Sequence, residues 1–133
     1  MHHKVIVIGN LGRDPEKRYT QEGSPVTSFP VASNSSYKDR DGNKKTKTTW
    51  FRCSAWNKFA DTCEKYLKKG SKVYMEGELI ADTNGSPKVF KRSDNTFGSS
   101  FELKITKILF LDGKQDTDMQ QEEEDYKDDE IPF

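Results

Sequence analysis

Hydrophobic residues in the first 111 positions recur in short alternating or β-branched runs, which polar turn sequences separate. This pattern is typical of β-strands. The predicted strands span residues 4–8, 26–37, 48–56, 72–80 and 101–111. In the last strand the apolar side changes between Ile105 and Ile108, which predicts a β-bulge. Pro30 has no backbone N–H to donate, so its strand should have an edge or a bulge there.

In one segment, residues 57–69, the apolar residues recur at helical spacing instead. Asn57 can cap a helix that continues to about Lys69, and Gly70 suits the position after its end. The apolar residues of this segment share one helical face: Phe59, Cys63, Tyr66 and Leu67. Three strands, a helix and two strands do not make parallel βαβ units. The order predicts an all-β fold, a five-stranded OB-fold barrel with one helix between strands 3 and 4, and this fold binds oligonucleotides across one face.

Two polar segments connect predicted strands. Residues 38–47 should form a hairpin loop that turns at Asp41-Gly42. Residues 81–100 contain the turn signals Asn84-Gly85 and Asp94-Asn95, and they predict a longer hairpin excursion.

The net charge of zero for all 133 residues hides two oppositely charged parts. Residues 1–111 carry 20 basic and 12 acidic side chains, whereas the rest carries ten acids and two lysines. We therefore expect one domain over 1–111, a disordered acidic linker over 112–127 and an apolar-tipped segment over 128–133. A basic domain with an acidic tail indicates a nucleic-acid surface joined to an interaction tail. The tip predicts a ligand for a pocket on a partner protein, through Asp128, Asp129, Glu130, Ile131, Pro132 and Phe133.

Several classes of protein are disfavoured by composition. No apolar run approaches the ~20 residues of a membrane span, and the N-terminus lacks a signal-peptide pattern, so we expect a cytoplasmic protein. Cys53 and Cys63 make neither a disulfide framework nor a zinc motif, and they should be small buried residues. The chain has no P-loop, no GxSxG and only terminal histidines. We expect no enzyme, no cofactor and no metal site.

The third predicted strand carries the strongest chemical signal. Because side chains alternate between faces, Phe51, Cys53 and Ala55 share a core face. The opposite face then holds Trp50, Arg52, Ser54 and Trp56. Two tryptophans and a cation suit the stacking of unpaired bases, worth roughly 1–3 kcal/mol per base. The indoles could instead cover a second core or a subunit interface.

Two further aromatics stand beside cations on the polar hairpins. Tyr37 is near Lys38 and Arg40, and Phe90 is near Lys88, Lys91 and Arg92. Such residues can wrap a flexible single strand, whereas a duplex hides its base faces. Alternatively, each aromatic packs on its own hairpin, and the lysine-rich residues 44–47 form a solvated turn.

Several segments together resemble bacterial single-stranded DNA-binding proteins: KVIVIGNLGRDPEKRYT at 4–20, TTWFRCSAWNKFAD at 48–61, YLKKGSKVYMEGEL at 66–79 and the DDEIPF end. The resemblance implies stacking aromatics at Tyr37, Trp50 and Trp56 and, more loosely, at Phe90. It implies basic contacts at Lys4, Arg40, Arg52, Lys58 and Lys69. Residues 81–93 are longer than is usual in that family, which leaves Phe97 as an alternative to Phe90. The family often has tryptophan at the position of Tyr37 and histidine at that of Phe51.

The resemblance further implies a nucleoid-associated homotetramer that binds single-stranded DNA without sequence preference. It would protect the strand during replication, recombination and repair, and would recruit partner proteins through the C-terminal tip. The alternative is an OB-fold primosome-type adaptor that acts mainly in protein docking.

Overall fold

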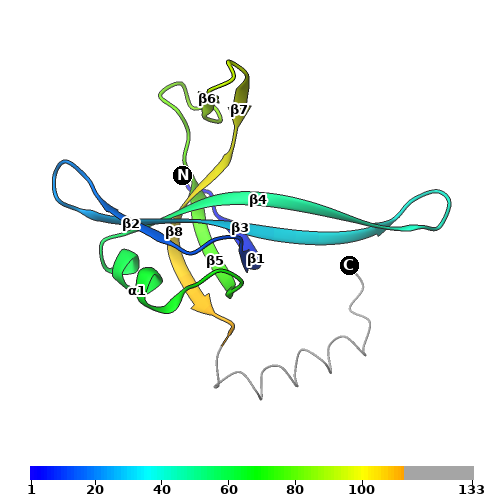
Figure 1. Ribbon diagram of the computed structural model, residues 1–133, viewed down its shortest axis with the longest axis horizontal. Helices are drawn as coiled ribbons and strands as arrows, with labels where there is room; N and C mark the ends of the chain where they lie inside the picture. The colour runs from blue at the N-terminus through cyan, green and yellow to red at the C-terminus, as the bar shows by residue number, and fades with distance from the viewer. Residues whose placement is uncertain (113–133) are drawn as a thin grey trace.

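The computed structural model describes residues 1–112. Their strands form a sheet with the order β1-β5-β8-β4-β3-β2, and a further pairing of β1 with β3 closes it into a barrel (Figure 1). The element bounds are β1 Val5–Leu11, β2 Glu16–Tyr19, β3 Pro25–Lys38, β4 Lys44–Trp56, α1 Lys58–Tyr66, β5 Lys72–Leu79, β6 Val89–Lys91, β7 Phe97–Ser99 and β8 Phe101–Phe110. The predicted five-stranded barrel, with a helix between its third and fourth strands, is confirmed. Apart from Asp112, the predicted linker and the predicted tip lie outside the described residues.

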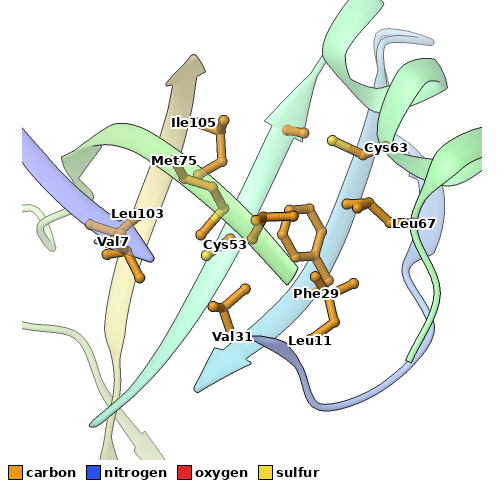
Figure 2. Packing of buried hydrophobic residues seen from close by; sticks show 12 residues of the cluster. Val7, Leu11, Phe29, Val31, Cys53, Cys63, Leu67, Met75, Leu103 and Ile105 are labelled. Carbon is orange, nitrogen blue, oxygen red and sulfur yellow. The ribbon is translucent and has the colours of Figure 1, made fainter. Parts of the chain in front are cut away.

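The barrel interior is filled by side chains from its strands and from the segment around α1 (Figure 2). Phe29 and Met75 are the largest of the fully buried side chains. Cys53 and Cys63 are buried as predicted, and burial raises the pKa of each thiol to about 12. Both thiols are therefore protonated at neutral pH and take part in packing rather than in thiolate chemistry.

The helix differs from its prediction in two respects. It ends at Tyr66, because Leu67 has extended backbone angles and turns its side chain into the core. Asn57 stands at the N-cap position, but its side chain makes no capping hydrogen bond. Instead the Thr27 hydroxyl donates to the Ala60 carbonyl at 2.8 Å, which ties the helix to β3. Among residues 1–112, no helix has the length and apolar character needed to cross a membrane.

The two strand irregularities are explained by the pairing. Thr106 is the extra residue of a bulge, because Gly77 pairs with Ile105 and Glu76 pairs with Lys107. The predicted bulge in the last strand is confirmed. Pro30 accepts a hydrogen bond from the Gly12 N–H at 3.0 Å on the side of β3 away from β4. Its ring nitrogen faces the same side, where the β2 pairing stops at Ser28 and the β1 pairing starts at Val31. The strand therefore loses no ladder hydrogen bond there.

The β3–β4 hairpin and the β6–β7 hairpin project from the barrel (Figure 1). The β3–β4 hairpin is paired out to Lys38 and Lys44, so five of the ten residues predicted as loop over 38–47 are strand. Its turn is short because the Asp39 carboxylate accepts the backbone N–H groups of Asp41 and Asn43. The second projection is the predicted excursion, in which β6 pairs with β7.

Candidate nucleic-acid interface

The two faces of β4 are divided as its alternation predicts. Cys53 and Ala55 are completely buried, and Phe51 packs against the core from its margin. On the opposite face Trp50 has 53% of its surface exposed, and Arg52 is exposed as well. A large aromatic side chain that stays half exposed on an otherwise well-packed barrel indicates a contact surface for a ligand.

A groove of about 810 Å³ passes over this exposed face of β4. Its aromatic lining includes Trp50 and Phe101, the first residue of β8. Four cations line it from three parts of the chain: Arg13, Arg18, Lys47 and Arg52. Asp14 and Glu16 also reach the groove. The Asp14 carboxylate accepts the backbone N–H of Lys69 at 2.8 Å, and the Glu16 carboxylate lies 3.1 Å from the Arg18 guanidinium. The groove thus combines flat apolar surfaces with positive charge, as a channel for a single nucleic-acid strand does.

Strand β2 adds a cation that the sequence pattern did not reveal. Arg18 pairs with Val26, and Val26 pairs with Trp56 across β3 and β4. Directly opposed residues share a face, so Arg18 lies in one row with Trp56 on the outer surface. Its neighbour Lys17 points the other way, and its Nζ lies 2.7 Å from the Asp61 carboxylate on α1. This hydrogen bond raises the pKa of Lys17.

Tyr37 lies well away from the groove. It is 54% exposed near the end of the β3–β4 hairpin and pairs with Lys45. By strand alternation it belongs to the face opposite that of Trp50. Arg40 is exposed in the turn at the end of the same hairpin. The structure therefore separates this pair from the tryptophans along the hairpin and does not gather the four residues into one cluster.

The β6–β7 hairpin places its two phenylalanines on opposite faces. Phe90 pairs with Gly98, whereas Phe97 pairs with Lys91. The Arg92 guanidinium stands over the Phe90 ring at 5.4 Å and donates to the Phe97 carbonyl at 2.7 Å. A Cβ on Gly98 would come within 2.8 Å of the Phe90 ring, so glycine leaves the space that this ring and Arg92 share. Phe90 therefore has a fixed cation partner, while Phe97 is 68% exposed.

Lys4 faces a different part of the barrel. Its Nζ lies 2.9 Å from the Glu76 carboxylate, which also accepts the Tyr74 hydroxyl at 2.8 Å. These hydrogen bonds lower the pKa of Glu76 and raise that of Lys4. By alternation Lys4 shares the outer face of β1 with Ile6 and Ile8. The ion pair thus occupies Lys4 in the isolated chain.

The two remaining predicted cations flank α1. Lys58 is exposed as its first residue, two positions after Trp56 at the end of β4. Lys69 is exposed in the connection to β5, and its backbone is bonded to Asp14 beside the groove. Within residues 1–112, no group of three or more His, Cys, Asp or Glu side chains is placed to hold a metal ion.

Comparison with known proteins gives one consistent family. Residues 2–97 match the model of the single-strand binding protein family. The chain is 49% identical over 77 residues to a single-stranded DNA-binding protein 1 of Chlorobaculum tepidum, covering 58% of this chain and 48% of that one. It is 41% identical over 102 residues to a single-stranded DNA-binding protein of Xanthomonas axonopodis, covering 76% and 57%. The chain thus spans about half the length of these curated relatives.

Solved structures agree with the architecture. A Plasmodium falciparum SSB in complex with single-stranded DNA superposes with a TM-score of 0.69 and 26% identity, over 84% of this chain and 97% of that one. A single-stranded DNA-binding protein from Thermus aquaticus superposes with a TM-score of 0.65 at 22% identity, over 84% and 51%, which supports the fold alone.

Proposed function

Because the chain belongs to the single-strand binding protein family, we propose that it binds single-stranded DNA along the groove over β4. The observation that carries the proposal is the half-exposed indole of Trp50 inside a groove lined by three arginines and a lysine. Unpaired bases can stack on the indole while the cations neutralise phosphates. A duplex presents phosphates but keeps its base faces stacked internally, so it would gain only the second interaction.

The proposed path continues beyond the groove in both directions. Trp56 and Arg18 extend it across β2, and Lys58 follows Trp56 by two residues in the sequence. Phe90 with Arg92 offers a stacking site on the β6–β7 hairpin, which favours Phe90 over Phe97 because only Phe90 has a cation held over its ring. Tyr37 and Arg40 would meet a strand that wraps along the β3–β4 hairpin. Every base has a π-face, so binding of this kind needs no sequence preference.

The cation on β2 provides a test of this path. Replacing Arg18 with glutamine removes one phosphate partner, so the slope of log affinity for poly-dT against log salt should fall in magnitude by about 0.7. Lys65→Gln is the matched control, since this lysine lies on α1 outside the groove lining. An Arg18→Gln slope equal to that of the parent, measured by titration at several salt concentrations, would remove Arg18 from the path.

We further propose that the chain assembles as a homotetramer through the outer face of the β1–β5–β8 sheet. Ile6 and Ile8 are more than half exposed on β1, and Ile8 lies in one row with Tyr74 and Leu109. Large aliphatic side chains are seldom grouped on a surface that stays in water. Glu76 lies in one row with Ile6 on this face and, with Lys4, would contribute polar contacts there.

The acidic tail is proposed to recruit partner proteins of replication, recombination and repair through residues 128–133. The single observation behind this is the apolar Ile-Pro-Phe end on a strongly acidic segment. Deleting residues 128–133 should abolish binding to a partner enzyme, while poly-dT affinity stays equal or rises slightly at low salt because an acidic competitor is removed.

Pull-down with a partner enzyme, alongside a DNA titration, separates the outcomes of this deletion. Unchanged partner binding would refute the role of the tip. A primosome-type adaptor, which acts mainly in protein docking, would retain partner binding when both tryptophans are replaced and would lose little of its function. This result would favour the adaptor over a protein that acts by binding single-stranded DNA.

A further inference from the structure

The indole of Trp50 lies against a glycine in the connection from β1 to β2. A Cβ built on Gly12 would lie 2.6 Å from Cζ3 and 2.7 Å from Cη2 of Trp50. Carbon atoms that are not bonded do not approach so closely, since optimal contact is near 3.5–4.0 Å. Any side chain at position 12 would therefore compete with the six-membered end of the indole for the same space.

The backbone around Gly12 is the fixed partner in this contact. The Gly12 N–H donates to the Pro30 carbonyl at 3.0 Å. One residue earlier, the Leu11 N–H donates to Ser71 and the Leu11 carbonyl accepts from Gly70, both at 2.9 Å. The Trp50 indole, by contrast, is joined to the backbone of β4 by rotatable side-chain bonds, and the residue is half exposed. An added methyl group at position 12 would displace the indole and not the main chain.

The neighbouring Gly9 shows what a purely structural glycine looks like in this strand. A Cβ there would lie 2.2 Å from the backbone carbonyl oxygen of Ala32, in the β1–β3 pairing that closes the barrel. Substitution at Gly9 would strain the barrel itself. The atoms that a substitution at Gly12 displaces belong to the candidate site.

We propose that Gly12 is a positioning residue for base stacking: it lets the Trp50 indole lie against the β1–β2 connection in the orientation that the groove requires. The inference rests on the proposed function. A side chain held in its binding orientation loses less conformational entropy when the ligand arrives, so removing this contact lowers affinity without removing a ligand contact. Arg13 follows Gly12 directly and lines the same groove, so the indole and a cation are placed by one segment.

The test is a double-mutant cycle in the full chain, with poly-dT as the probe. Gly12→Ala should weaken binding about tenfold, within the range that loss of one stacked base gives. In a Trp50→Ala background the same substitution should change affinity by less than about twofold, because the indole it acts on is gone. With Trp56→Phe as the parent, emission comes from Trp50, and Gly12→Ala should shift its maximum and reduce its quenching by poly-dT.

Each outcome of the cycle is decisive. If Gly12→Ala binds as tightly as the parent while Trp50→Ala binds weakly, the positioning role is wrong and the stacking proposal stands. If Gly12→Ala is equally harmful with and without the indole, Gly12 acts through something other than Trp50, which also overturns the inference. If Trp50→Ala itself has no effect, the proposed stacking fails.

A second background separates positioning from folding. Trp50→Phe removes the ring atoms that a Cβ at position 12 would meet, so Gly12→Ala should be tolerated there, with an unchanged thermal unfolding midpoint and unchanged affinity. A Gly12→Ala loss of stability that persists in the Trp50→Phe background would identify a structural glycine instead and would refute the proposal.

Discussion

Replacing Trp50 with alanine should weaken poly-dT binding by about 1–3 kcal/mol, and Trp56→Ala should have an effect in the same range. The reason is that each indole offers a flat apolar surface on the outer face of β4, where an unpaired base can stack. Because Trp50 is half exposed, its truncation leaves the barrel core intact. The loss should therefore appear in affinity and not in the thermal unfolding midpoint.

Tyr66→Ala provides the control for these tryptophan variants. This tyrosine is 60% exposed, but it lies at the end of α1 and contacts Phe110, outside the groove lining. Its truncation should leave poly-dT affinity within about twofold of the parent, since it removes no stacking surface from the path. Tryptophan variants that fold and bind like Tyr66→Ala would show that the two indoles of β4 do not carry the interaction.

The second large effect is expected in assembly. The parent should have about four times the 15.3 kDa chain mass by light scattering at micromolar concentration. Ile8→Glu should reduce that mass. Burying an isoleucine in the subunit interface stabilises the assembly by roughly 1.5–3 kcal/mol, whereas a carboxylate in its place must be desolvated. The loss is repeated in every subunit of a symmetric assembly.

The control for assembly is Val89→Glu, which places the same charge on an exposed apolar residue of the β6–β7 hairpin. Its mass should equal that of the parent. A parent that is monomeric at micromolar concentration, or an Ile8→Glu variant that keeps the full mass, would refute assembly through the outer face of β1.

Alternation and parity predicted those parts of the fold that depend on local sequence. The two faces of β4 followed from a period of two, and the bulge in β8 followed from a change of apolar side between Ile105 and Ile108. The sequence predicts a loop at residues 38 and 44–47, the polar end of β3 and start of β4, because no core lies beneath them. They are strand because backbone pairing continues to Lys38 and Lys44 without any need for apolar side chains.

The parts of the candidate site that were missed depend on partners distant in sequence. Glu16 to Tyr19 shows no apolar alternation and becomes a strand only through pairing with β3, so the position of Arg18 was not foreseen. That Phe90 and Phe97 lie on opposite faces of their hairpin also follows from the cross-strand register. The turn at 92–96 fixes this register, and composition does not reveal it. Gly12 and Trp50 are 38 positions apart in the sequence, so their contact could be recognised only from the closed barrel.

The most direct test of the central claim is to titrate the intact chain with poly-dT and, separately, with a duplex of equal phosphate content. Tryptophan emission is the signal that is monitored. The proposed stacking predicts strong quenching by poly-dT, little quenching by the duplex, and an affinity for poly-dT that falls as salt rises. Equal responses to the two nucleic acids, or no quenching by poly-dT at low salt, would contradict single-strand binding through the indoles of β4.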